Sequence, residues 1–217
     1  KDLKDTLTWL PENDAEFEDM FSKRGNAPYV NYLAGNFIQA FGEEWHDKWA
    51  HIALSQLKKF GFNTVANWSE WDIAKAAAFP YVRPLSLRLE KTKRIYRDFP
   101  DVFAPTYKEE AKALAQQLEE TKDDPAFIGY FLMNEPTWGF SKELPAAGML
   151  FNTPECDTRN ELARFLSQKH KNDASLASAW NMNVTLEEVK SGVWTKRFST
   201  EALQDLASFS ELMCDEF

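Results

Sequence analysis

The chain has 217 residues, which is enough for one large domain or for one domain with an appendage. Hydrophobic residues make up 44% of it and charged residues 27%, a composition that supports a packed core and excludes an intrinsically disordered chain. The 25 Lys and Arg residues are outnumbered by 34 Asp and Glu residues, so the net charge of −9 repels a phosphate backbone and argues against a nucleic-acid partner.

Membranes are also disfavoured as partners, because no stretch approaches the roughly 18 uninterrupted apolar residues that span a bilayer. The first ten residues lack the apolar centre of a secretory signal, so we expect either a cytosolic protein or one whose leader has been removed. The two cysteines, Cys156 and Cys214, could pair in an oxidising compartment or remain thiols, and the sequence leaves both states open.

The first part of the chain predicts one strand and one helix. Residues 1–28 mix charged residues with prolines and a glycine and show no sustained period, so we expect an irregular lead-in or linker. Residues 29–34 form a short apolar stretch that ends at Gly35, which predicts the first strand. Over residues 43–60 the apolar residues recur on one helical face, and Gly61 is expected to end that helix.

The next part predicts two further strands and a second helix. Residues 62–68 are compatible with a strand and end in polar and aromatic residues, as strands do where their tips line a site. Residues 79–87 predict a third strand, which must be short or irregular because Pro80 and Pro84 remove two hydrogen-bond donors. Apolar residues return to helical spacing over residues 107–118.

Residues 127–133 form a nearly continuous apolar run, which indicates a fourth strand that is parallel and buried on both faces. Strands and helices therefore alternate from residue 29 to residue 133, and this order predicts an α/β fold built from parallel β/α units. No glycine-rich turn of a nucleotide-binding type follows any of these strands. A TIM (β/α)8 barrel is therefore favoured over a nucleotide-binding sheet.

Residues 140–217 are predicted to be a helical insertion. Thr158-x-x-Glu161 and Thr185-x-x-Glu188 match the capping box that starts many helices, and an amphipathic pattern runs from residue 203 to residue 217. The same patterns would suit a plain helical interaction module, which stays open as an alternative for this segment.

The predicted fourth strand leads directly into Asn134-Glu135-Pro136. In a (β/α) barrel the reactive groups project from the C-terminal ends of the strands. Glu135 would stand where the apolar core meets a cleft, and loss of hydration there favours the protonated form that a general acid needs. Glu135 is therefore the candidate catalytic residue, and the alternative is a solvated glutamate that begins a loop.

Asn67, Trp68, Trp71 and Trp138 follow predicted strand ends, and barrel geometry would bring them to the same face as Glu135. Rigid aromatic rings stack on sugars, and amide groups bond sugar hydroxyls both as donors and as acceptors. Asn67, Trp68 and Trp138 are therefore candidate substrate-binding residues, whereas packing between strand and helix explains Trp71 equally well.

The sequence offers little support for other kinds of catalysis. None of the three histidines, His46, His51 and His170, belongs to a zinc-binding motif, and no GxSxG nucleophile elbow occurs. We therefore expect no metal and no cofactor.

Two segments, residues 57–69 (LKKFGFNTVANWS) and residues 124–136 (DPAFIGYFLMNEP), resemble the clan-A retaining glycoside hydrolases. The resemblance is strongest to the family 50 β-agarases and more distant to the family 42 β-galactosidases, and it extends in weaker form over roughly residues 29–139. It implies a secreted or periplasmic hydrolase that cleaves the β-glycosidic bonds of a galactose-type polysaccharide, such as agarose. In this family an Asn-Glu pair at the end of strand four supplies the acid/base carboxyl group and an amide that contacts the sugar 2-hydroxyl. The resemblance implies that Glu135 is the acid/base and that Asn134 provides this amide.

A retaining glycosidase needs two carboxyl groups roughly 5–5.5 Å apart. The family carries its nucleophilic glutamate at the end of strand seven, whereas this chain reaches strand four and the helical insertion. We therefore expect residues 29–217 to be the N-terminal part of a barrel, with the nucleophile outside the chain. We favour a fragment whose missing half belongs to a longer protein, although a separate chain could supply that half, or a divergent protein could use another carboxylate. The alternatives are a β-galactosidase that acts on oligosaccharides and a non-catalytic glycan-binding protein.

Overall fold

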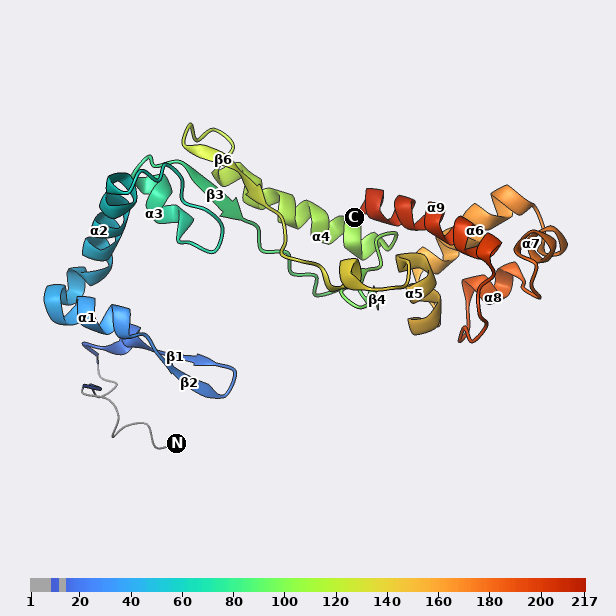
Figure 1. Cartoon of the computed structure of the whole chain (residues 1–217), viewed down its shortest axis with the longest axis horizontal. Coiled ribbons are helices and arrows are strands. Elements are labelled where there is room, and N and C mark those ends of the chain that lie inside the picture. Colours follow the sequence, from blue (N-terminus) through green and yellow to red (C-terminus); the bar gives the residue numbers. More distant parts are fainter. Residues whose placement is uncertain (1–8, 12–14) are drawn as a thin grey trace. The chain divides into compact units, whose positions relative to one another are not determined.

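The computed structural model describes residues 9–11 and 15–217, and the chain divides into two compact units, Lys1–Val82 and Arg83–Phe217 (Figure 1). Helices and short strands both occur, which confirms the predicted α/β class. Within the described residues the strands pair as β1 (Phe21–Arg24) with β2 (Ala27–Val30), β3 (Tyr81–Pro84) with β6 (Phe127–Phe131), and β4 (Arg94–Tyr96) with β5 (Phe99–Pro100). In the part of the chain that the structure describes, no helix is both long enough and apolar enough to cross a bilayer.

The first unit contains an antiparallel hairpin, in which β1 and β2 pair along their whole length. The expectation of an irregular lead-in over residues 1–28 is therefore wrong from residue 21 onward. Pairing with a partner strand, and not a local period, defines these strands, so the composition of the segment gave no sign of them. Residues 1–8 and 12–14 of the predicted lead-in lie outside the described residues.

The strand predicted over residues 29–34 is wrong for most of its length, because the chain turns there into α1 (Tyr32–Phe41). Asn31 caps this helix, since its Oδ1 accepts a backbone N–H of the first turn at 3.2 Å. Gly35 lies inside α1, where an added Cβ would stand only 2.6 Å from Sδ of Met20. The end of the apolar run, at Ala34 and Gly35, therefore lies on the buried face of a helix that packs closely against Met20.

The helix predicted over residues 43–60 is confirmed as α2 (Trp45–Lys59), and α3 (Trp71–Ala76) follows it. Between the two helices, the strand predicted over residues 62–68 is reduced to a single parallel bridge between Val65 and Tyr81. The parallel sense expected of β/α units is thus present, although the strand itself is only a bridge.

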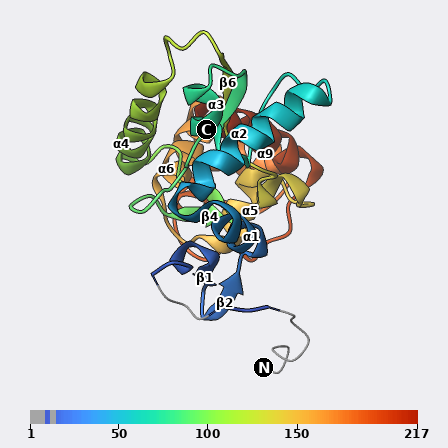
Figure 2. The same cartoon turned by 90° about the vertical axis from the view of Figure 1, so that its left-hand side faces the viewer.

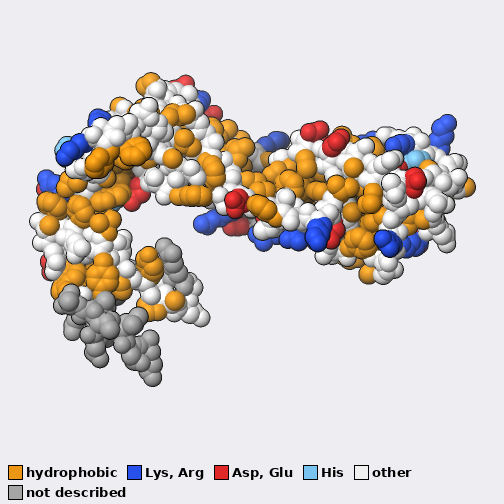
Figure 3. Space-filling view, viewed as in Figure 1, with side chains coloured by type: hydrophobic (Ala, Val, Ile, Leu, Met, Phe, Trp, Pro, Cys, Tyr) orange, Lys and Arg blue, Asp and Glu red, His pale blue; other side chains and the backbone are white. Residues whose placement is uncertain are grey.

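Apolar side chains of the first unit remain largely at the surface. α1 packs against α2 (Figure 2), but no residue of α2 is fully buried. Hydrophobic side chains gather on the surface over α1 and α2 (Figure 3). The large exposed ones on these two helices and directly after α2 are Leu33, Phe41, Ile52 and Phe60.

The third and fourth predicted strands are present as β3 and β6, which are neighbours in one sheet. The expectation that the fourth strand is buried on both faces is wrong for the described residues, because no residue of β6 is fully buried and Ile128 is 57% exposed. β3 is short, as the two prolines in its segment predict. Pairing continues past β3, because the N–H of Leu85 donates to the carbonyl oxygen of Phe131 at 2.9 Å. The helix predicted over residues 107–118 is present as α4 (Pro105–Ala115) and continues as η4 (Gln116–Glu120).

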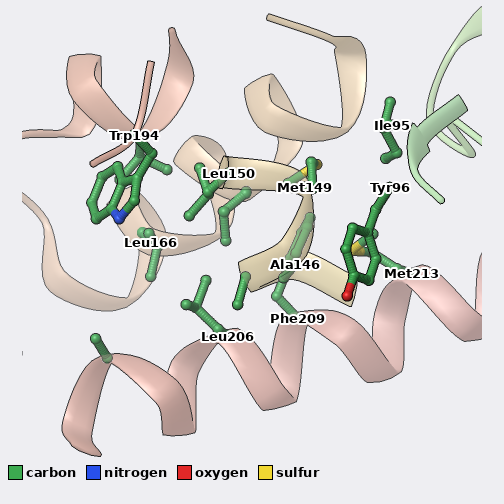
Figure 4. Close-up of a cluster of buried hydrophobic side chains, with 14 of the residues drawn as sticks. Ile95, Tyr96, Ala146, Met149, Leu150, Leu166, Trp194, Leu206, Phe209 and Met213 are labelled. Carbon is green, nitrogen blue, oxygen red and sulfur yellow. The ribbon is translucent and has the colours of Figure 1, made fainter. Parts of the chain in front are cut away.

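The remainder of the second unit is helical, as its periodicities predict. Its largest helices enclose a buried cluster that also includes Ile95 and Tyr96 of β4 (Figure 4). Met149, Leu206 and Phe209 are fully buried in this cluster. The helices are α5 (Pro145–Asn152), α6 (Asp157–His170), α7 (Asp173–Trp180), α8 (Leu186–Lys190) and α9 (Thr200–Glu216).

One of the two predicted capping boxes is confirmed. Thr185 caps α8, and the side chain of Glu188 accepts the N–H of Thr185 at 3.0 Å. The box predicted at Thr158 is wrong, because Thr158 lies inside α6. A distant carboxylate, Asp101, instead accepts the N–H groups of Asp157 at 3.0 Å and of Thr158 at 2.8 Å, and the Thr158 hydroxyl at 2.5 Å.

Two buried charged residues link the helices of this unit. Arg159 is fully buried and donates only to backbone carbonyl oxygens among its described hydrogen bonds. Asp205 of α9 is also buried and accepts from Lys169 at 2.6 Å, from Trp180 Nε1 at 2.8 Å, and lies 2.6 Å from His170 Nε2. These contacts join α9 to α6 and α7.

Candidate active site

Glu135 stands in the loop that follows β6, as the sequence predicts, but its surroundings differ from the prediction. Both Asn134 and Glu135 are exposed. The expected loss of hydration at Glu135 is therefore wrong for the described residues. Glu135 also has a φ of 27°, a left-handed conformation that is strained for a residue other than glycine and is enriched at functional sites.

Asp98 anchors the chain directly after Glu135 and Pro136, at the start of η5 (Thr137–Phe140). Its Oδ2 accepts the N–H of Thr137 at 2.9 Å. Its Oδ1 accepts the Thr137 hydroxyl at 2.6 Å and the N–H of Trp138 at 3.1 Å. Burial acts to raise the pKa of Asp98, but these hydrogen bonds outweigh it and hold the pKa below its ordinary value. Asp98 is thus a carboxylate that fastens the loop.

A second contact from the same hairpin holds the far end of this segment. The Tyr96 hydroxyl lies 2.7 Å from Ser141 Oγ and 2.8 Å from Glu143 Oε2. The hydrogen bond from Tyr96 is the main reason that the pKa of Glu143 is below its ordinary value. The β4–β5 hairpin therefore fixes both ends of the stretch from residue 137 to residue 143.

The indole of Trp138 is half-buried and packs against the core of the unit. Its ring centroid lies 5.0 Å from that of Phe99 and 6.0 Å from that of Phe217, both in edge-to-face geometry. Its Nε1 is buried and makes no hydrogen bond within the described residues. The structure therefore favours a packing role for Trp138 over the predicted role of a sugar platform.

A cavity of about 270 Å³ adjoins the C-terminal end of β6. Seven of its nine lining residues are apolar, and the other two, Arg94 and Asp98, are charged. Its lining residues are Leu85, Leu87, Leu89, Arg94, Asp98, Pro100, Leu132, Met133 and Phe217.

The other two predicted binding residues, Asn67 and Trp68, belong to the first unit, so they are described apart from Glu135. Asn67 is half-buried, whereas Trp68 is 75% exposed and has a φ of 66°. The neighbouring Trp71 stacks on Tyr81, with ring centroids 5.9 Å apart and an interplanar angle of 25°. Packing therefore explains Trp71, while Trp68 keeps an indole surface that a ligand can reach.

Sequence reasoning missed Asp98, which accepts three hydrogen bonds from the Glu135 loop. The local signal for its position is a two-residue turn, Arg97-Asp98, between short apolar segments, with Arg97 at a φ of 53°. Such a turn predicts a hairpin but does not show which loop its carboxylate reaches.

Neither cysteine is in a disulfide, so of the two open states the structure has the thiols. Burial raises the pKa of Cys156 to about 12, which keeps it protonated and unreactive. Within the described residues, no group of three His, Cys, Asp or Glu side chains is arranged to hold a metal ion.

Comparison with known proteins supports the resemblance noted in the sequence, although no protein-family model matches the chain. β-Agarase B of Vibrio sp. (strain JT0107) is 24% identical over 97% of this chain, and β-agarase A of the same strain is 24% identical over 70%. The chain spans 25% of the length of β-agarase B and 17% of that of β-agarase A.

Three solved structures superpose on nearly the whole chain, each at 22% identity. The agarase AgWH50C has a TM-score of 0.80, an exo-β-agarase 0.79 and PfGH50B 0.81; the chain covers 33%, 32% and 34% of their lengths. The chain shares its fold with part of an agarase. The resemblance to β-agarases in residues 57–69 and 124–136 is therefore confirmed, and it extends to the helices after residue 140.

Proposed function

We propose that this chain is part of a glycoside hydrolase that cleaves the β-glycosidic bonds of agarose, with Glu135 as its general acid/base. The observation that carries the proposal is the Asn134-Glu135 pair, which directly follows β6 in a chain that aligns with agarases over nearly its whole length. The left-handed backbone of Glu135 and the bonds that fasten its loop support it.

The proposed reaction is a retaining hydrolysis with two carboxyl groups. Glu135 gives its proton to the glycosidic oxygen while the C–O bond breaks and the bonding pair passes to that oxygen. A carboxylate nucleophile bonds to the anomeric carbon in the same step. Glu135 then takes a proton from water, whose oxygen replaces the nucleophile at that carbon. We propose that the nucleophile is a carboxylate from outside this chain.

The proposed architecture is a (β/α)8 barrel of which this chain supplies one part. The parallel bridge at Val65 and the pairing of β3 with β6 are consistent with neighbouring barrel strands. β6 and the residue after it carry apolar side chains that are far more exposed than barrel strands allow, at 57% for Ile128 and 66% for Leu132. Closure of a barrel would cover them, either by the rest of a longer protein or by a separate chain.

Substrate contacts follow from the same proposal. Asn134 would bond the sugar 2-hydroxyl, and Trp68 would provide a stacking surface beside the amide of Asn67. Agarose is a polymer too large to enter a cell, so the proposed activity implies a secreted or periplasmic protein.

The test is Glu135→Gln in the full-length protein, assayed for agarose hydrolysis and for binding. We expect turnover to fall by about 10²–10⁴-fold, the usual share of general acid catalysis, with binding nearly unchanged. Glu155→Gln is the matched control, since Glu155 is an exposed glutamate of the same unit, and it should leave turnover unchanged. Equal hydrolysis by the Glu135 variant and the native protein would refute the role of Glu135. Binding without hydrolysis by the native protein would favour the glycan-binding alternative.

A further inference from the structure

The loop that carries Glu135 is held by one side chain just beyond it. Asn134 and Glu135 are exposed, and Glu135 has a strained backbone, so they need support from neighbouring residues to keep one position. That support lies at Thr137 and Trp138, whose N–H groups both donate to Asp98, as does the Thr137 hydroxyl. One residue, Pro136, therefore separates Glu135 from a fixed attachment.

Asp98 itself belongs to a hairpin whose side chains are tightly packed. It occupies the turn of the β4–β5 hairpin, and the side chains on both sides of that turn are buried, at 5% exposure for Tyr96 and 0% for Phe99. Gly148 of α5 approaches the Tyr96 ring so closely that an added Cβ would lie 2.4 Å from it. The hairpin therefore has little room to move, and the Asp98 carboxylate keeps its place.

We infer that Asp98 is a positioning residue that sets the location of Glu135, an inference that rests on the proposed role of Glu135. General acid catalysis requires the donor to lie within hydrogen-bond reach of the leaving oxygen. A displacement of about 1 Å costs on the order of 10²-fold in rate. Asp98 acts through the backbone of the loop and has no described contact with the Glu135 carboxyl group.

The chain contains a matched control for this role in Asp101. Like Asp98, Asp101 follows a strand end of the hairpin and accepts three hydrogen bonds, two from backbone N–H groups and one from a threonine hydroxyl. Its bonds fasten the N-terminus of α6 and not the Glu135 loop. Loss of either carboxylate therefore removes the same kind of contact, but only loss of Asp98 should affect the acid.

The test compares two substrates in the full-length protein. An agaro-oligosaccharide has a poor leaving group that needs a proton, whereas a dinitrophenyl glycoside of the same sugar leaves without one. We expect Asp98→Ala to lower kcat/KM on the oligosaccharide by about 10–100-fold and on the dinitrophenyl glycoside by less than about 3-fold. Glu135→Gln should show the same selective loss to a greater degree.

Asp98→Asn serves as the conservative variant and also as the substitute if the alanine variant does not fold. It keeps one acceptor oxygen, so its selective loss should be smaller than that of Asp98→Ala. Asp101→Ala should lower the melting temperature while the ratio of kcat/KM for the two substrates stays as in the native protein. Three results would overturn the inference. They are equal losses on both substrates in the Asp98 variants, no loss in those variants, and the same selective loss in Asp101→Ala. A Glu135 variant without selective loss would instead refute the proposed function.

Discussion

Arg159 offers a direct test of what holds the helical unit together. Its side chain is fully buried, and its described partners are all backbone carbonyl oxygens. Its guanidinium therefore donates hydrogen bonds to carbonyl oxygens that would otherwise need water as a donor. Nε donates to the carbonyl oxygen of Val189 at 2.7 Å and Nη2 to that of Glu188 at 2.7 Å. The carbonyl oxygens of Thr153 at 2.8 Å, Pro154 at 2.9 Å and Gly192 at 2.6 Å share the two N–H groups of Nη1.

The informative substitution is Arg159→Lys. It keeps the positive charge but replaces the planar guanidinium, which donates from three nitrogens, with an ammonium group that donates from one. An ammonium has three donors, so at least two of the five carbonyl oxygens lose their bond to residue 159. Pro154 also accepts the N–H of Gly192 at 2.8 Å, so at least one of the others is left without a described partner. Each buried unsatisfied group costs about 1–3 kcal/mol, so we expect the free energy of unfolding to fall by at least about 1 kcal/mol. Arg159→Leu removes every donor, leaves four of these oxygens without a described partner, and should cost at least about 4 kcal/mol.

The assay is urea unfolding followed by far-ultraviolet circular dichroism, with Arg164→Lys as the control. Arg164 lies on the same helix, is exposed, and pairs with Glu161, so its replacement by lysine should change the free energy of unfolding by less than about 0.5 kcal/mol. A free energy of unfolding for Arg159→Lys within about 0.5 kcal/mol of the native value would show that the fork of hydrogen bonds does not stabilise the unit.

Two further predictions concern pH and substrate binding. Burial acts to raise the pKa of Asp205, but hydrogen bonds from Lys169, Trp180 and His170 hold it below its ordinary value. Asp205 therefore contributes stability that is complete above its unfolded pKa of about 3.9 and is lost as the pH falls through the lower folded pKa. Urea unfolding should show Asp205→Asn less stable at pH 7, with the two proteins converging in acid; a constant difference down to pH 2 would contradict this. Trp68→Ala should weaken agarose binding by about 2–10-fold, as expected for one lost aromatic contact, without lowering the melting temperature. Trp71→Ala should do the reverse because Trp71 stacks on Tyr81, and equal effects of the two variants on binding would contradict the assignment of Trp68.

The elements that the sequence predicts well are those that depend on local spacing. The helical face in residues 43–60 and the capping box at Thr185 need no distant partner, and both are present. The hairpin of β1 and β2 and the start of α6 depend on contacts far away in the sequence. Asp101 replaces the predicted cap at Thr158 from 57 positions away, which no local pattern can show.

In the candidate site, too, the sequence predicts the features that depend on local pattern and not those that depend on distant contacts. The apolar run of β6 predicts where Glu135 lies along the chain, because an apolar strand that ends in polar residues is a local pattern. Exposure of Glu135 and packing of Trp138 depend on which surfaces cover them, and the sequence of the strand does not contain that information. Asp98 could not be assigned to the Glu135 loop for the same reason, since 39 positions separate it from Thr137.

The most direct test of the central claim is chemical rescue of Glu135→Ala by azide in the full-length protein. Without its acid/base, the glycosyl intermediate should be trapped by azide when an activated aryl β-galactoside is the substrate, because azide needs no proton removed. We predict faster turnover with azide and a β-galactosyl azide product, identified by nuclear magnetic resonance. An α-galactosyl azide would make Glu135 the nucleophile, and the absence of any rescue or azide product would contradict its role as the acid/base.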